Sequence, residues 1–303
     1  MKEIDYKLKQ NTFFSQAAKS KFKFNILVIV IIYFILWLAG LCIGRLTANL
    51  VLNILMTALI VDNSLIFVFK KFIVWGIQIL FFFIWVRYVE KRPIKTMGFQ
   101  AISPLKSYFI GFLVGFIAIS IITVILAFMG KVEYKSFNDD FSPLLLGAIA
   151  LGWIVQSASE EIAIRGWLIP MLGNRSTPVT AIVLTAFIFG ILHLFSSGVT
   201  VLSFTNLVLS GVFFAEYAIY SNNIWGVCGL HFSWNFVMGN IYGFPVSGFS
   251  SLGEIVFKMK HVGSIFFTGG DFGPEGGFIT SVILLIGIGI LTLMLLKKQF
   301  KTG

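Results

Sequence analysis

Apolar residues run in long stretches along this chain, and short polar connections separate them. Eight stretches approach or reach the about 20 residues that a helix needs to cross the hydrocarbon core of a bilayer. They cover residues 24–43, 72–86, 108–129, 143–172, 178–195, 199–220, 224–242 and 278–296. A further stretch, 51–62, is shorter, and we expect it to lie along the membrane surface. The pattern predicts an all-α fold, a polytopic transmembrane helical bundle of about eight spans.

The composition argues against a water-soluble domain. Hydrophobic residues make up 57% of the 303 residues and charged residues only 12%, whereas a soluble domain carries about 25% charged residues. The net charge of +10 would suggest a nucleic-acid partner in a soluble protein. Here it is better explained by loops that face an anionic membrane leaflet. We therefore expect membrane lipids as partners and no nucleic acid.

Basic residues orient the predicted bundle. Lys and Arg gather before the first span, after the second and after the last. An even number of spans puts these three clusters on one side, which the positive-inside rule makes cytoplasmic. The prediction is a multi-pass protein of the cell membrane with both termini in the cytoplasm. It divides into N-terminal spans and loops (1–142), a core rich in polar residues (143–242), and an extracytoplasmic loop with the last span (243–303).

Three ionisable residues lie close together inside the predicted fourth span. Such groups cost about 2.5–3.5 kcal/mol each at bilayer depth, so each is a candidate functional residue. Glu161 and Arg165 are one helical turn apart with the acid first, the favourable order for an ion pair, and we interpret them as structural. Glu160 lies about 100° around the helix and has no such partner. An unpaired carboxylate in an apolar site suits a general base or acid near neutral pH.

Two histidines and an asparagine occupy later spans. His231 and Asn235 share one helical face, and a neutral amide is a donor that can stabilise an oxyanion. His193 has no polar residue one turn away on its own helix, so we expect a partner across the bundle, with Glu160 the best candidate. A carboxylate with two imidazoles can activate water directly or through a metal ion. Glu160, His193 and His231 would also make a workable zinc set.

The depths of these residues conflict if the helices are straight. Glu160 then falls past mid-membrane toward the cytoplasm, and His193 falls near the outer side. Their meeting requires strongly tilted helices or a different start of the fifth span. Of the other ionisable residues, His261 is expected in a solvated loop, and Glu216 at a helix contact, in the cavity or near an interface. Close helix packing is expected at four glycines, Gly190, Gly211, Gly226 and Gly229.

Three spaced motifs occur in order inside these spans. They are Glu-Glu-x-x-x-Arg at 160–165, Phe-x-x-x-His at 189–193 and His-x-x-x-Asn at 231–235. Together they resemble the CAAX protease and bacteriocin-processing (CPBP or Abi) family, which includes the Ras-converting type of CAAX prenyl endopeptidase. The resemblance covers about residues 143–240. The stretches at 90–93 and 273–277 are similar to bacterial members, but more weakly.

The resemblance implies a role for each matching residue. Glu160 would activate the attacking water together with His193, while His231 and Asn235 would hold the developing oxyanion. Glu161 would pair with Arg165 and orient Glu160. The family is described as metalloproteases, and a metal-free glutamate mechanism is discussed equally, so zinc stays an open cofactor. The implied activity is a membrane-embedded endopeptidase acting on a membrane-associated protein or peptide.

Two other functions fit a membrane bundle with buried polar groups. A non-catalytic scaffold or bacteriocin-immunity protein is one, but a scaffold has no reason to hold costly groups in the bilayer. An ion-coupled transporter is the other. The sequence shows no internal repeat and no second acidic cluster, which transporters of this kind often have. The protease is therefore the preferred interpretation.

Overall fold

The structure, a computed structural model, describes residues 2–58, 63–250 and 253–298. Within these ranges, six helices are long and apolar enough to cross a membrane. They are α3 (Ile26–Ala58), α4 (Asn63–Ile84) with the π-helical turn η1 (Trp85–Val89), α5 (Pro104–Phe128), the continuous rod of α6 (Pro143–Glu161), η3 (Ile162–Leu168) and α7 (Ile169–Gly173), α9 (Val201–Ser221), and α12 (Phe278–Lys297). The all-α polytopic bundle is confirmed.

The two other predicted spans are helices of different length. α8 (Pro178–Leu192) is apolar but short, and α10 (Ile224–Phe236) continues into the π-helical turn η4 (Val237–Ile241). One prediction is wrong: residues 51–58 do not form a separate surface helix but continue α3, because no glycine or proline interrupts the helix there. Residues 59–62 of that stretch lie outside the described ranges.

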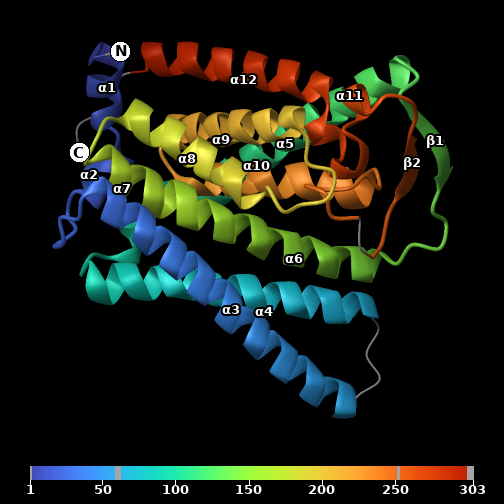
Figure 1. The fold of residues 1–303 in the computed structure, drawn as a ribbon, viewed down its shortest axis with the longest axis horizontal. Helices are drawn as coiled ribbons and strands as arrows, with labels where there is room; N and C mark the ends of the chain where they lie inside the picture. The colour runs from blue at the N-terminus through green and yellow to red at the C-terminus, as the bar shows by residue number, and fades with distance from the viewer. Residues whose placement is uncertain (1, 59–62, 251–252, 299–303) are drawn as a thin grey trace.

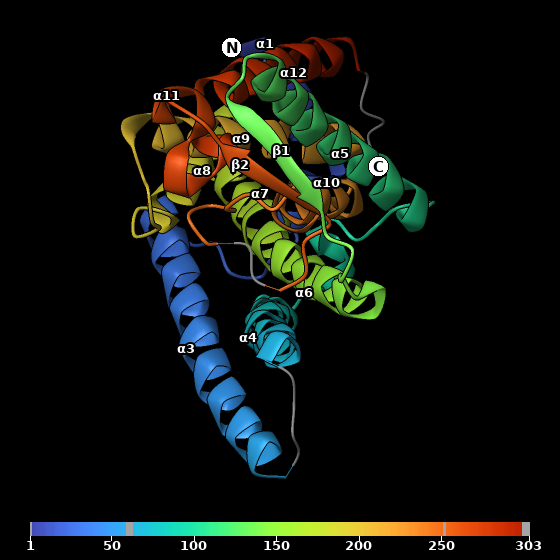
Figure 2. The same cartoon turned by 90° about the vertical axis from the view of Figure 1, so that its right-hand side faces the viewer.

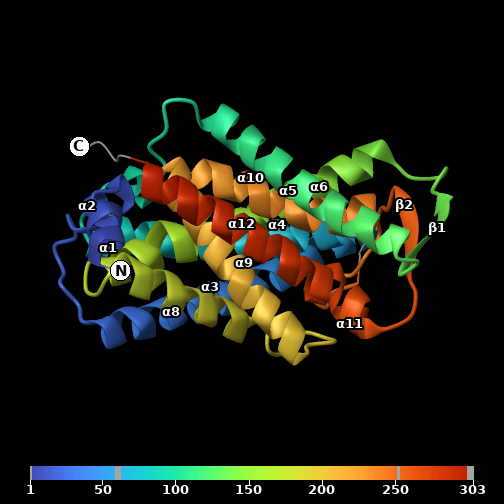
Figure 3. The ribbon, with the colours of Figure 1, turned by 90° about the horizontal axis from the view of Figure 1, so that it is seen from above.

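Helices α9 and α10 lie at the centre of the bundle, and α8 packs beside α9 (Figure 1). α5 packs along α10, α12 along α9, and α6 connects this centre to α4. Figure 2 shows α3 leaning away from the other helices toward its C-terminal end, while it stays in contact with α4. Seen from above, α12 crosses over α9, with α5 on one side and α8 on the other (Figure 3). Nearly every residue of α10 is buried, so polar residues on it must find partners inside the protein.

Glycines allow α5 and α10 to approach each other closely. A Cβ atom on Gly229 would lie 2.0 Å from the carbonyl oxygen of Tyr108, and one on Gly111 would lie 1.8 Å from that of Gly226. Neither position has room for a side chain, so the two backbones are in direct contact. Tight contacts are found at all four glycines predicted to permit them, Gly190, Gly211, Gly226 and Gly229.

A two-stranded antiparallel sheet and short helices complete the fold. β1 (Val132–Phe137) pairs antiparallel with β2 (Phe257–His261), so Val132 lies opposite His261. The short elements are α1 (Lys2–Lys9), α2 (Thr12–Ala17), η2 (Ile94–Met97), α11 (Ile265–Thr268), η5 (Gly270–Phe272) and η6 (Pro274–Gly276). His261 stacks on Phe244, with ring centroids 4.7 Å apart, and its Nε2 is buried. The expectation of a solvated loop histidine is therefore wrong, because an aromatic ring covers its face.

Two charges near the end of the second span are buried rather than solvated. Glu90 is fully buried and accepts hydrogen bonds from Arg92 Nε and Trp167 Nε1, both at 2.5 Å. Arg92 also donates to Thr96 Oγ1 at 2.7 Å. This pair anchors the chain after η1 against η3, the turn that follows the paired acids of the first motif.

Candidate active site

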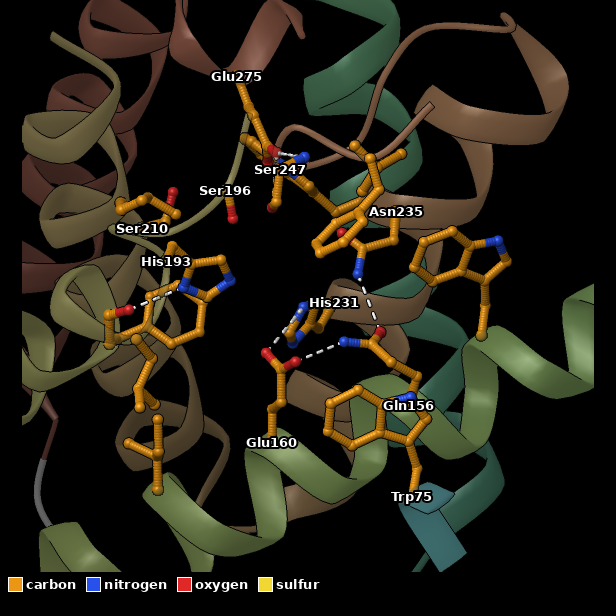
Figure 4. A pocket seen from close by; sticks show the side chains of 18 of the residues that line it. Trp75, Gln156, Glu160, His193, Ser196, Ser210, His231, Asn235, Ser247 and Glu275 are labelled. Atoms are coloured by element: carbon orange, nitrogen blue, oxygen red, sulfur yellow. Dashed lines mark hydrogen bonds and ion pairs between the residues drawn. The ribbon is translucent and has the colours of Figure 1, made fainter. Parts of the chain in front are cut away.

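A cavity of about 530 Å³ lies among α3, α4, α6, α8, α9 and α10. Its walls include Glu160, His193, His231 and Asn235, which come from three helices and from all three motifs (Figure 4). Glu161 and Arg165 do not line it. The structure therefore brings Glu160, His193, His231 and Asn235 together around one space, and leaves the Glu161–Arg165 pair outside it.

Glu160 stands in the last turn of α6 with a polar neighbour. Gln156 lies one turn earlier, and its Nε2 donates to Glu160 Oε1 at 2.5 Å. The other oxygen, Oε2, lies 3.9 Å from Nε2 of His231, which is too long for a hydrogen bond. On its own helix Glu160 therefore has a neutral hydrogen-bond donor, Gln156, which the sequence-based search for an ion-pair partner did not consider. The i,i+4 spacing of Gln156 and Glu160 was the signal that could have shown it.

Glu161 connects the first motif to the third. Its Oε1 accepts a hydrogen bond from Arg165 Nη1 at 2.8 Å, and both side chains are buried, which confirms the predicted ion pair. The same oxygen lies 2.7 Å from Nδ1 of His231. The Arg165 guanidinium also sits 5.1 Å from the ring of Phe189 and 5.4 Å from that of Phe214. Glu161 is thus an ion-pair partner and, in addition, the residue that orients His231.

His193 caps the C-terminal end of α8. Its Nδ1 lies 2.8 Å from the carbonyl oxygen of Phe189, one turn earlier. A carbonyl only accepts, so Nδ1 carries the proton and Nε2 is left for the cavity. The last carbonyls of a helix have no intrahelical partner, which is why this bond forms. It replaces the partner predicted across the bundle, and no hydrogen bond joins His193 to Glu160 in the described residues.

Asn235 reaches the first motif through a residue that the motifs do not include. Its Nδ2 donates to Gln156 Oε1 at 3.2 Å, so Gln156 bridges Asn235 and Glu160. Sequence reasoning missed Gln156 and other polar residues of the cavity wall, among them Arg45, Lys71, Ser196, Ser210, Ser247, Ser250 and Glu275. Glu216 is not among them, because it faces α12, where Thr292 Oγ1 donates to it at 2.8 Å.

The proposed zinc ligands do not gather into one set. Among the described residues, no group of three His, Cys, Asp or Glu side chains is placed to share a metal ion. Glu160 and His231 approach each other, but His193 does not join them. Each imidazole uses Nδ1 within the protein, which leaves Nε2 free, as is usual for histidines that bind a metal ion. It is the placement of the three side chains that does not match a three-ligand zinc site in the described residues.

Comparison with known families agrees with the geometry. Residues 142–237 match the model of the Rce1-like family, described as type II CAAX prenyl endopeptidase Rce1-like. This segment begins just before α6, ends at the start of η4 and contains all three motifs. No curated protein and no solved structure gives a significant match. The Rce1-like match over residues 142–237 confirms the resemblance to CAAX proteases that the three motifs predicted.

Proposed function

We propose that this protein is an intramembrane endopeptidase that hydrolyses a peptide bond in a membrane-associated protein or peptide. The observation that supports it most directly is the single cavity shared by the Glu160 carboxylate, the two imidazoles and the Asn235 amide. The Rce1-like match indicates a CAAX-type intramembrane protease. The candidate spans put this cavity within a membrane bundle, so a substrate must reach it from or along the bilayer.

Glu160 is the proposed base for the attacking water. Gln156 holds one of its oxygens, which leaves Oε2 to accept a proton from water in the cavity. His193 can accept a second hydrogen bond from that water through Nε2, because Nδ1 is bound to Phe189. The water oxygen then attacks the carbonyl carbon of the substrate. The proton held by Glu160 passes to the amine that leaves when the C–N bond breaks.

His231 and Asn235 are the proposed donors to the tetrahedral intermediate. When both its nitrogens are protonated, His231 donates to Glu161 through Nδ1 and offers Nε2–H to the cavity. Asn235 has two N–H bonds, of which Gln156 takes one. The other is available to the oxyanion. Donors held in place before the reaction are the most effective form of such stabilisation.

The two alternative functions gain no support from these observations. A scaffold or immunity protein does not need a cavity lined by a carboxylate, two imidazoles and an amide. A transporter would also bury acids, but the acid inside α9, Glu216, lies at the contact of α9 with α12 and not on the cavity wall. The Rce1-like match favours neither alternative.

The test compares two acids that both lie inside spans. Glu160→Gln should abolish cleavage, because the amide cannot accept the proton, while the purified protein stays folded. Glu216→Gln is the matched control and should cleave normally, because this acid is outside the cavity. The protein is reconstituted in liposomes with a library of fluorogenic peptides, and products are identified by mass spectrometry. Full activity in Glu160→Gln would overturn the proposal, as would ion flux without any peptide cleavage by the wild type.

A further inference from the structure

Glu275 is a buried carboxylate on the cavity wall with no role in the proposed reaction. Its Oε1 accepts hydrogen bonds from the backbone N–H of Ser247 at 2.5 Å and from the Ser247 hydroxyl at 2.8 Å. Its Oε2 accepts one from Trp234 Nε1 at 3.0 Å. Three neutral donors from two separate segments thus converge on one carboxylate. Figure 4 shows Glu275 and Ser247 together at the end of the cavity farthest from Glu160.

The backbone that carries Glu275 is held rigidly. Gly273 has φ +102°, and a Cβ there would lie 2.1 Å from the carbonyl oxygen of Pro245. Only glycine combines this conformation with so close an approach. Asn206 Nδ2 donates to the carbonyl oxygens of Glu275, at 2.8 Å, and Gly277, at 2.9 Å. The position of the carboxylate is therefore set by the fold of the turn.

Through Trp234, Glu275 contacts the helix that carries the proposed oxyanion donors. Trp234 immediately precedes Asn235 and is buried. Its ring lies 6.1 Å from that of Phe214, which in turn lies 5.2 Å from the His231 ring. The indole hydrogen bond thus fixes the rotation of α10 next to both donors.

Through Ser247, Glu275 also holds a loop against the segment that follows His193. Gly248, next to Ser247, donates its N–H to the carbonyl oxygen of Phe272 at 3.0 Å. A Cβ on Gly248 would lie only 2.3 Å from the carbonyl oxygen of Ser197. The loop, the Glu275 turn and the connection after His193 are therefore packed backbone to backbone.

We propose that Glu275 is a positioning residue for the cavity, acting through the Trp234 hydrogen bond on Asn235 and His231 and through Ser247 on the wall near His193. The proposal rests on the proposed endopeptidase function. Glu275 lies outside the matched segment 142–237, so the chain completes this site with a residue far along its sequence. Small displacements of catalytic groups cost much activity, about 10²-fold for 1 Å.

The first test is a double-variant cycle on cleavage. In Glu275→Gln, the amide oxygen can keep both Ser247 donors, but its NH₂ group then faces the Trp234 N–H. We expect kcat to fall about 10- to 100-fold with KM changed much less. Trp234→Phe removes the same hydrogen bond, so the double variant should be no slower than Glu275→Gln alone. Glu254→Gln is the matched control, because this half-buried loop acid binds the Ser142 N–H outside the cavity and should keep wild-type kcat.

A second measurement does not depend on the protease activity. The Trp234 indole N–H signal, assigned by its loss in Trp234→Phe, should shift in Glu275→Gln and not in Glu254→Gln, in spectra of the ¹⁵N-labelled protein. Should Glu275→Gln fail to fold, Ser247→Ala removes one donor and should still lower kcat. The proposal is overturned if Glu275→Gln keeps wild-type kcat. It is also overturned if kcat of the double variant falls by the product of the two factors measured for Glu275→Gln and Trp234→Phe alone. Absence of cleavage by the wild type, with the indole shift present, would instead count against the endopeptidase function.

Discussion

Nδ1 of His231 lies 2.7 Å from Oε1 of Glu161, the same oxygen that accepts from Arg165 at 2.8 Å. One carboxylate oxygen thus serves both a buried cation and a proposed catalytic imidazole. Its second oxygen, Oε2, is buried without a hydrogen-bond partner among the described residues. The ion pair of the first motif and His231, the proposed oxyanion donor of the third motif, are therefore physically coupled.

This coupling predicts that stability and activity separate at Arg165. Arg165→Ala leaves the buried Glu161 carboxylate without its cation and should lower the free energy of unfolding by about 3–5 kcal/mol. The double variant Glu161→Gln with Arg165→Met removes both charges and should recover much of that stability. Cleavage should stay low in the double variant, because the carboxylate that holds His231 through Nδ1 is gone. Thermal unfolding in detergent and kcat report the two effects.

An exposed ion pair gives the control for that experiment. Lys135 and Glu133 form a solvent-exposed pair on β1, and Lys135→Ala should change stability by less than about 1 kcal/mol. Equal losses of unfolding free energy in Lys135→Ala and Arg165→Ala would show that burial does not determine how much stability a broken ion pair loses. Full cleavage by the double variant would show that Glu161 does not orient His231.

The proposed role of Asn235 as an oxyanion donor predicts that replacing it lowers the rate of cleavage without changing the pH dependence. Asn235→Ala removes one proposed oxyanion donor and should lower kcat by roughly 10²–10³. Gln156→Met is the informative contrast, because it removes the N–H that binds Glu160 directly. Its activity–pH profile should shift, whereas that of Asn235→Ala should not. A shifted profile in Asn235→Ala would place Asn235 in the water-activating set.

Cleavage is expected to survive metal chelation. In the described part of the chain, no third carboxylate or imidazole is placed to share a metal ion with Glu160 and His231. Activity should therefore be unchanged after dialysis against 1,10-phenanthroline. Loss of activity that zinc alone restores would show that Glu160, His193 and His231 rearrange into a ligand set, and that the histidine roles proposed above are wrong.

The bundle, and the motif residues that line its cavity, could be picked out from the sequence because both depend on local patterns. Apolar length defines spans, and a charged group inside one is conspicuous wherever the helix lies. The predicted conflict in depth between Glu160 and His193 came from treating each helix separately. Glu160 stands 13 residues before Gly173 and His193 stands 15 residues after Pro178, about 20 and 22 Å at 1.5 Å per residue. The two helices are joined by the connection between Gly173 and Pro178. Glu160 and His193 lie at similar distances from this connection, so they reach a similar depth in the bundle.

What the sequence did not predict depends on where elements end and on distant loops. The partner of His193 is a carbonyl, and it is available only because α8 ends at Leu192. Helix ends are the least certain part of a sequence-based assignment. Glu275 contacts Trp234 only because a glycine turn 41 residues further along folds back over α10. No local period in the sequence encodes such a contact.

Packing at α5 and α10 predicts a sharp contrast between two glycines. A Cβ on Gly229 would overlap the Tyr108 carbonyl, which is backbone and cannot move aside alone. Gly229→Ala should therefore push the two helices apart and lower the melting temperature by several degrees or prevent folding. Gly289→Ala in α12 has no atom within 4 Å of the new Cβ and should change the melting temperature little. Equal melting temperatures for the two variants would contradict this packing.

His261 links the stability of the β1–β2 pair to pH. Burial lowers the pKa of His261 from its ordinary value of 6.5, while a backbone hydrogen bond with Gly270 acts in the opposite direction and is the smaller effect. The ring stacks on Phe244. Lys260 precedes His261 on β2, and Lys131 immediately precedes β1. The folded state therefore holds His261 neutral at pH values where the unfolded chain already binds a proton.

A group with a depressed pKa in the folded state contributes stability above its unfolded pKa and loses it as the pH falls. The strand pair should therefore open more readily as the pH falls below about 6.5. Amide hydrogen exchange of residues in β1 and β2 at pH 7.5 and 5.5, corrected for the intrinsic rates, measures this. His261→Phe keeps a ring against Phe244 but cannot titrate, so its protection should be the same at both pH values. The exposed Glu133–Lys135 pair cannot imitate the effect, because Lys135 lowers the pKa of Glu133 further below this range. Equal pH dependence in the wild type and in His261→Phe would show that another group controls the opening of the β1–β2 pair.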